Sequence, residues 1–213
     1  MDRAVILGAG TYGQVYSEYI SEQNKFKIIG FLDDDDQKVG KLYNGLEVLG
    51  RVGNFESIQG LNIKAIFAPI GNNKIRVKLL EKARSFGYET PCFIHESAII
   101  HSTVKIGTAV YILPNSSIMP LTNLADYVMV SMGVNIAHHV NLDRGCFLSQ
   151  GSNIGASLNI GAQSFVGISS TIMTGVTSIG KNTTIGAGAL VIRDVEDNAV
   201  MVGSPAKVLK YND

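Results

Sequence analysis

Residues 148–172 read LSQGSNIGASLNIGAQSFVGISSTI, and every sixth position of this stretch, counted from its first, is Leu, Ile or Val. The repeat extends back without an exception to residue 100, through Ile100, Ile106, Ile112, Ile118, Leu124, Val130, Ile136, Leu142, Leu148, Ile154, Ile160, Val166 and Ile172. It slips by one residue at Thr177–Ser178 and then continues at Ile179, Ile185 and Val191. A second series, four residues further on, is small or β-branched except at Leu158.

This repeat decides the fold of the C-terminal part. An α-helix has a period of 3.6 residues, so it cannot hold an apolar residue on one face at every sixth position. A parallel β-helix can, because three short strands form one triangular coil and the aliphatic side chains of successive coils stack inside it. Sixteen aliphatic positions at three per coil give about five coils.

The first ninety residues have a different pattern, in which strands and helices alternate. Short apolar runs predict strands at residues 4–7, 27–32 and 64–70, and residues 14–23 and about 74–85 have helical patterns. The second helix is predicted to bury Ile75, Leu79, Leu80 and Ala83. Alternation of this kind predicts a small parallel sheet with helices on its faces. We therefore expect an α/β domain of residues 1–92 and an all-β domain of residues 93–213.

Composition narrows the class of protein. Hydrophobic residues make up 46% of the chain, and 18 basic residues balance 18 acidic ones, so the basic excess of a nucleic-acid-binding groove is missing. No apolar run approaches the roughly 18 residues of a membrane-spanning helix, and the run before Gly8 is too short for a secretory signal. Cys92 and Cys146 fit neither a disulfide framework nor a zinc site. We expect a cytoplasmic protein without a metal, a membrane span or a nucleic-acid partner.

The glycine pattern Gly8-x-Gly10-x-x-Gly13 lies between a predicted strand and a predicted helix. This is the context of a phosphate-binding turn, where backbone N–H groups and a helix N-terminus meet an anion. The acidic residues at the end of the next strand, about 20 residues on, occupy the place where a dinucleotide fold binds a ribose hydroxyl. Taken alone, the pattern predicts NAD binding; the alternative is a tight turn followed by solvated acids.

The chain has four histidines, so there are few candidates for a catalytic base. His95 and His101 lie where the two predicted domains join, and capping or structural roles are expected for them. His138 and His139 are adjacent, and since successive strand residues face opposite ways, at most one is expected to face a given cleft. A neutral imidazole can accept a proton from an attacking amine or hydroxyl near pH 7.

The hexad form [Ile/Leu/Val]-Gly-x-x-[Ser/Thr/Ala/Val]-x resembles that of the hexapeptide-repeat acyltransferases, and so does the C-terminal stretch Val202-Gly203-Ser204-Pro205-Ala206-Lys207. The resemblance implies a left-handed parallel β-helix and a homotrimer. Four stretches in order narrow it further, namely residues 8–13, 30–35, 70–76 and 94–98. They are similar to the sialic acid O-acetyltransferase family, which includes the UDP-4-amino-sugar N-acetyltransferases of bacillosamine synthesis and the perosamine N-acetyltransferases.

The family resemblance implies an acetyl-CoA-dependent N-acetyltransferase acting on a nucleotide-linked amino sugar in surface glycan biosynthesis. It implies that the N-terminal half-Rossmann domain binds the nucleotide sugar and that His138 is the general base. It also implies that the backbone N–H of Ala156 donates a hydrogen bond to the thioester carbonyl oxygen and that Lys207 contacts a CoA phosphate. The substrate-binding residues that we infer are Gly8, Gly10, Tyr12, Gly13, Asp33, Asp34, Asp35, Gly71, Asn72 and Ser131.

The sequence departs from this family pattern at three positions. His139 stands where the amino-sugar enzymes carry Glu, Phe147 where many relatives have a second histidine, and Ser131 where a substrate-contacting Asn is expected. The carboxylate that orients His138 stays open between Asp126 and Asp143.

Three alternatives to this function are considered. The acceptor could be a sugar hydroxyl, as in sialic acid O-acetylation, or the protein could bind a sugar nucleotide without catalysis. A γ-type carbonic anhydrase is disfavoured, because it needs three histidines converging on zinc and no third histidine lies on a nearby hexad.

Overall fold

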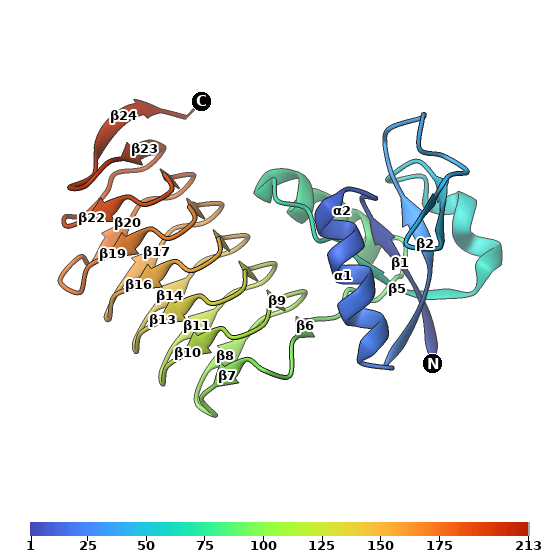
Figure 1. Ribbon diagram of the computed structural model, residues 1–213, viewed down its shortest axis with the longest axis horizontal. Coiled ribbons are helices and arrows are strands. Elements are labelled where there is room, and N and C mark those ends of the chain that lie inside the picture. The colour runs from blue at the N-terminus through green and yellow to red at the C-terminus, as the bar shows by residue number, and fades with distance from the viewer. Residues whose placement is uncertain (213) are drawn as a thin grey trace. The chain divides into compact units, whose positions relative to one another are not determined.

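The computed structural model describes residues 1–212, and the chain forms two compact units, Met1–Pro91 and Cys92–Asp213 (Figure 1). The N-terminal unit has a five-stranded sheet in the order β3-β4-β2-β1-β5. Its strands are β1 (Asp2–Leu7), β2 (Phe26–Leu32), β3 (Leu42–Tyr43), β4 (Leu46–Gly50) and β5 (Ile63–Phe67). All neighbouring pairs are parallel except β3 with β4. The helices are α1 (Thr11–Glu22), α2 (Asn73–Ser85) and the short 3-10 helix η1 (Phe55–Leu61).

Strand β1 lies inside this sheet, between β2 and β5. Its last four residues, Ala4 to Leu7, are all fully buried, as expected for a parallel strand covered on both faces. Residues 27–32 and 64–67 of the predicted strands are in β2 and β5. The hairpin of β3 and β4 and the helix η1 were not predicted, because a strand of two residues, a strand of five residues and a short 3-10 helix are too short to show a clear periodic pattern.

Helix α1 begins at Thr11, three residues earlier than predicted, so Gly13 belongs to its first turn. A Cβ at Gly13 would lie 1.8 Å from the carbonyl oxygen of Gly8, so only glycine lets the helix start so close to the end of β1.

The predicted buried face of α2 was partly wrong. Ile75 is 49% exposed, whereas the face that packs inward consists of Asn73, Arg76, Val77, Leu80 and Ala83. Arg76 is fully buried because its guanidinium donates hydrogen bonds to the carbonyl of Ile70, at 2.8 Å, and to Oδ1 of Asn73, at 2.9 Å. A hydropathy pattern treats arginine as a surface residue, so it could not show this arrangement.

The C-terminal unit is a parallel β-helix whose repeated strands are two residues long. Adjacent coils pair at a separation of 18 residues, as in Ile118 with Ile136. One sheet has six strands: β7 (Ile99–Ile100), β10 (Ser117–Ile118), β13 (Asn135–Ile136), β16 (Asn153–Ile154), β19 (Thr171–Ile172) and β22 (Leu190–Val191). The second has five: β8 (Lys105–Ile106), β11 (Asn123–Leu124), β14 (Asn141–Leu142), β17 (Asn159–Ile160) and β20 (Ser178–Ile179).

The third sheet has eight strands: β6 (Phe93–Ile94), β9 (Tyr111–Ile112), β12 (Met129–Val130), β15 (Phe147–Leu148), β18 (Phe165–Val166), β21 (Thr184–Ile185), β23 (Ala199–Val202) and β24 (Lys207–Tyr211). The last strand, β24, runs antiparallel to β23 and covers the end of the stack. The successive coils of the stack are visible side by side in Figure 1.

The predicted aliphatic ladder forms the core of this unit. From Ile112 to Val191, every ladder residue is at most 3% exposed. Ile100 and Ile106, in the first coil, are half-buried against the same core. The predicted slip is also present, because Asn159 pairs with Ser178 at a separation of 19 residues. In this unit the side chains of one sequence series therefore lie in one continuous apolar stack.

Candidate active site

A pocket of about 350 Å³ lies in the N-terminal unit at the carboxyl ends of β1, β2 and β5. Open α/β sheets bind ligands at this edge. Seven of the ten predicted substrate-binding residues line it: Gly8, Gly10, Tyr12, Gly13, Asp33, Asp34 and Gly71. The N-cap of α1 is Gly10, which has no side-chain cap, so the first turn of this helix can meet an anion.

The remaining predicted residues of this unit make contacts of their own. The side chain of Asn72 caps α2 by accepting a hydrogen bond from the N–H of Ile75 at 3.0 Å. Oδ1 of Asp35 accepts one from the N–H of Gln37, also at 3.0 Å. Neither Asn72 nor Asp35 lines the pocket.

Asp33 is the acidic residue that the structure ties most closely to the glycine turn. Its Oδ2 accepts hydrogen bonds from the N–H of Ala9, at 2.7 Å, and from Nζ of Lys38, at 3.1 Å. Its Oδ1 accepts one from the N–H of Asp35 at 3.0 Å. Burial alone would raise the pKa of this carboxyl, but the two N–H donors and the Lys38 ammonium hold that pKa below its ordinary value. Asp33 is therefore an ionised side chain that holds the glycine turn through the N–H of Ala9, while Asp34 is exposed.

The cation of this pocket was missed in the sequence. Lys38 lines the pocket together with the glycine turn, and its side chain is 27% exposed. A lysine five residues after Asp33, just beyond the acidic run of residues 33–36, was a signal that could have been used.

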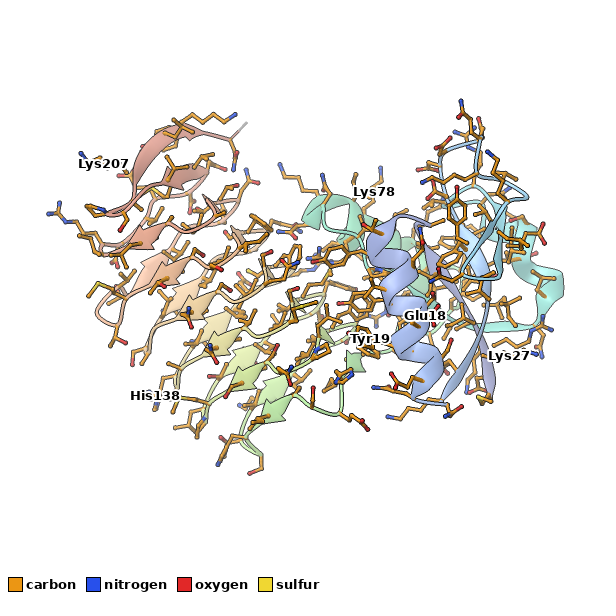
Figure 2. All side chains as sticks on the ribbon, in the orientation of Figure 1. Glu18, Tyr19, Lys27, Lys78, His138 and Lys207 are labelled. Atoms are coloured by element: carbon orange, nitrogen blue, oxygen red, sulfur yellow. The ribbon has the colours of Figure 1, made fainter. Side chains whose placement is uncertain are left out.

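His138 and His139 lie in the β-helix unit, on the corner between β13 and β14, and Figure 2 marks His138 at the edge of the coils. Both are exposed. Their Nδ1 atoms are 2.9 Å apart, and their rings are perpendicular, at 89°. The corner residue His139 has a φ of +56°, and the backbone of the pair is held between the neighbouring coils. The N–H of His139 donates to the carbonyl of Pro120, and the carbonyl of His138 accepts from the N–H of Ser157.

The two candidate orienting carboxylates have other partners. Oδ1 of Asp126 accepts a hydrogen bond from the N–H of Thr108 at 2.7 Å. Oδ1 of Asp143 accepts one from the N–H of Arg144 at 2.7 Å. The group in contact with Nδ1 of His138 is instead His139.

A groove of about 400 Å³ runs over the six-stranded sheet and includes the corner residues Ala137, Gly155 and Thr174 of three successive coils. Ala156 follows Gly155 and stands 18 residues after His138, which places it one coil further along the stack. Its N–H donates a hydrogen bond to Oγ1 of Thr174 at 3.2 Å.

The other predicted residues of this unit lie elsewhere. Ser131 is 1% exposed, and its carbonyl accepts a hydrogen bond from Oγ of Ser116 at 2.8 Å. Phe147 is 4% exposed and packs against Phe165. Lys207, near the C-terminal end of the stack (Figure 2), lines a second pocket of about 370 Å³ together with Arg193.

Within residues 1–212 no helix is long and apolar enough to cross a membrane. In the same residues, no three His, Cys, Asp or Glu side chains are grouped so that they could hold a metal ion.

Comparison with known proteins gives three results. Residues 3–83 match the PglD N-terminal domain. No curated protein matches the sequence. Several solved structures match almost the whole chain.

The acetyltransferase domain of PglB from Neisseria gonorrhoeae FA1090, solved in complex with acetyl coenzyme A, is 28% identical with a TM-score of 0.88, over 97% of this chain and 98% of that one. PerB from Caulobacter crescentus, solved with CoA and GDP-perosamine, is 27% identical with a TM-score of 0.90, over 99% and 98%. WeeI from Acinetobacter baumannii AYE, at 20% identity and a TM-score of 0.88 over 98% and 100%, shows the shared fold.

Proposed function

We propose that this chain, an acetyltransferase of the bacillosamine and perosamine type whose residues 3–83 form a PglD N-terminal domain, transfers the acetyl group of acetyl-CoA to the amine of a nucleotide-linked sugar. The observation that carries the proposal is the similarity over both units to two acetyltransferase structures. One of them was solved with acetyl coenzyme A and the other with CoA and GDP-perosamine. The β-helix is accordingly left-handed, as in the hexapeptide-repeat acetyltransferases that the sequence resembles.

The pocket of the N-terminal unit is suited to the nucleotide part of the acceptor. A nucleoside diphosphate carries negative charge, which the first turn of α1 and the Lys38 ammonium can bind. The exposed Asp34 can accept hydrogen bonds from ribose hydroxyls or from a base. Gly8, Gly10 and Gly13 have no side chains, so a ligand can approach their backbone. We assign residues 1–92 to this binding role.

The exposed imidazole of His138 is suited to the chemical step. In the proposed reaction, Nε2 of His138 accepts a proton as the sugar amine attacks the thioester carbonyl carbon. The C–N bond forms, the C–S bond breaks, and the proton passes to the departing CoA thiolate. Charge develops on the carbonyl oxygen, and an N–H one coil away, about 4.8 Å along the stack, can stabilise it. Ala156 has this position.

The remaining parts of the proposal concern acetyl-CoA and assembly. The groove over the six-stranded sheet and the pocket with Arg193 and Lys207 offer an apolar surface and two cations for the pantetheine and phosphates of CoA. Met119 and Met173, which line the groove, are 45% and 46% exposed, and neighbouring copies in a homotrimer would cover them. A cytoplasmic location, where acetyl-CoA is available, belongs to the same proposal.

The test is to incubate the protein with acetyl-CoA and a panel of UDP-, GDP- and dTDP-linked amino sugars, following free thiol release and product mass. Thiol release with an N-acetylated product is expected for at least one amino sugar. His138→Ala is expected to lower kcat by about 10²–10⁴-fold, the usual contribution of a general base.

Other outcomes of the same experiment would overturn the proposal. Acetylation of a sugar hydroxyl instead of an amine would establish an O-acetyltransferase. Tight binding of a nucleotide sugar without thiol release across the panel would establish a non-catalytic binding protein. Full activity of His138→Ala would exclude this residue as the base.

A further inference from the structure

The contact between the two adjacent histidines constrains where their protons lie. A neutral imidazole has one N–H and one bare nitrogen. The two Nδ1 atoms are 2.9 Å apart, so a hydrogen bond joins them when one Nδ1 carries the proton and the other accepts it. If Nδ1 of His138 donates, its Nε2 is bare and can act as a base. If Nδ1 of His138 accepts, its Nε2 carries the proton and cannot.

The backbone at this corner holds both residues in place. His139 has left-handed backbone geometry, and its N–H is bonded to the coil before it, while the carbonyl of His138 is bonded to the coil after it. The corner residues stacked next to the pair are Pro120 and Leu121 on one side and Ala156 and Ser157 on the other, and none of these is ionisable. The partner of Nδ1 of His138 is therefore an imidazole, at the place where Asp126 and Asp143 supply no carboxylate.

We propose that His139 is the positioning residue of this site: its Nδ1 accepts the hydrogen of Nδ1 of His138 and so holds His138 in the tautomer whose Nε2 receives the proton of the acceptor amine. This inference rests on the proposed function, in which His138 is the base. The hydrogen bond that one ring nitrogen of a histidine makes commonly decides which of the two nitrogens carries the proton. Here the partner in that hydrogen bond is an imidazole instead of a carboxylate.

The pairing also makes the site sensitive to a further proton. If His139 becomes a cation, both of its nitrogens are donors, and the hydrogen bond survives only when Nδ1 of His138 accepts. That arrangement puts the remaining proton of His138 on Nε2, so the base is blocked. If His138 becomes the cation, it cannot accept a proton at all. One added proton on either ring therefore stops the reaction.

The experiment compares side chains at position 139 that differ in what they can accept. His139→Ala removes the acceptor and is expected to lower kcat about tenfold or more, with the KM values for acetyl-CoA and the sugar nucleotide changed less than twofold. His139→Glu provides an acceptor and is expected to restore most of kcat. Because its negative charge favours the cationic form of His138, the acid limb of the pH profile should move to higher pH. His139→Lys can only donate and is expected to be as slow as His138→Ala.

A second readout does not depend on activity. Long-range ¹H–¹⁵N spectra of the imidazoles distinguish a ring protonated on Nδ1 from one protonated on Nε2. The wild type is expected to show His138 protonated on Nδ1 and His139 on Nε2, and His139→Ala should lose the fixed form of His138. His101→Gln, an exposed corner histidine of the same unit that bonds Thr103, is the control and should leave kcat and the His138 signals unchanged.

The outcomes separate the inference from the proposed function. If His138→Ala is inactive but His139→Ala and His139→Lys keep the wild-type kcat and pH profile, the role of His139 is wrong and the base stands. A wild-type His138 protonated on Nε2 would also overturn it. If the wild type acetylates no amino sugar, the proposed function fails first, and the spectra still report on the pair.

Discussion

The backbone N–H of Ala156 donates a hydrogen bond to Oγ1 of Thr174, 18 residues further on and one coil along the stack, at 3.2 Å. Under the proposed function, the same N–H has to donate to the thioester carbonyl oxygen instead of the Thr174 hydroxyl when acetyl-CoA binds. The hydroxyl of Thr174 therefore competes with the substrate for this donor. A net contribution of about 1 kcal/mol for such a hydrogen bond corresponds to about fivefold in binding.

We expect Thr174→Val, which keeps the shape and removes the acceptor, to lower the KM for acetyl-CoA about fivefold. The KM for the sugar nucleotide should not change. Thr108→Val, at a corner between β8 and β9 and outside the groove, is the matched control and should leave both KM values near those of the wild type. Initial rates at varied acetyl-CoA concentration measure the effect. An unchanged KM for acetyl-CoA in Thr174→Val would show that the Ala156 N–H does not bind the thioester.

Lys38 offers a prediction for the other substrate. Its Nζ donates a hydrogen bond to Asp33. If Lys38 moves to contact a phosphate, the carboxylate of Asp33 still accepts hydrogen bonds from the N–H groups of Ala9 and Asp35. Lys38→Met is expected to raise the KM for the nucleotide sugar about tenfold or more, because one charge-assisted contact contributes about 1.5–3 kcal/mol and about 1.4 kcal/mol corresponds to tenfold. Lys41→Met, in the same exposed segment but outside the pocket, is the control. Equal KM values for the two variants would show that Lys38 does not contact the substrate.

The fold could be predicted from the sequence where one physical constraint repeats. Each coil of the β-helix needs an aliphatic residue inside every strand, so the ladder from Ile100 to Val191 shows the period of six directly. The N-terminal sheet was predicted less completely, because the short strands β3 and β4 have no period to detect.

The site could be predicted only in part, for a similar reason. The glycine turn and Asp33 follow a local spacing, so the sequence indicates that they belong together. The burial of Arg76, which belongs to the packing of α2 and does not line the pocket, depends on the carbonyl of Ile70 and the amide of Asn73, which a hydropathy pattern does not include. The stacking of Ala156 and Thr174 on adjacent coils follows from their separation of 18 residues, but the hydrogen bond between them was not predicted. The approach of His139 to His138 depends on ring orientation at a left-handed corner, which spacing does not define.

The Asp33 carboxyl gives a pH prediction for the N-terminal unit. Its pKa is lower in the folded protein than the value of about 3.9 in an unfolded chain, so its contribution to stability is complete above that value. The contribution is lost as the pH falls through the lower folded pKa. We expect Asp33→Asn to be destabilised relative to the wild type at pH 6–7, and the difference to shrink below about pH 4.

Urea unfolding followed by helical circular dichroism measures this difference, since both α-helices of the described chain lie in the N-terminal unit. Asp36→Asn is the control, because Asp36 makes an exposed ion pair with Arg51, and such pairs contribute about 0–1 kcal/mol. If the difference in unfolding free energy between Asp33→Asn and the wild type stays constant from pH 7 to pH 3, the stabilising role of an ionised Asp33 is wrong.

Gly13 and Gly10 form a matched pair that tests how the turn is built. Alanine is the better helix former by about 1 kcal/mol, so Gly13→Ala would stabilise α1 if space were the same as in an open helix. A Cβ at Gly13 meets the carbonyl of Gly8 at 1.8 Å, whereas a Cβ at Gly10 meets no atom within 4 Å. We expect Gly13→Ala to destabilise the N-terminal unit by about 3 kcal/mol or more, since backbone has to move to remove the overlap. Gly10→Ala should cost about 1 kcal/mol as a poorer N-cap. Thermal unfolding followed by helical circular dichroism compares the two, and a Gly13→Ala protein as stable as Gly10→Ala would show that α1 does not begin against Gly8.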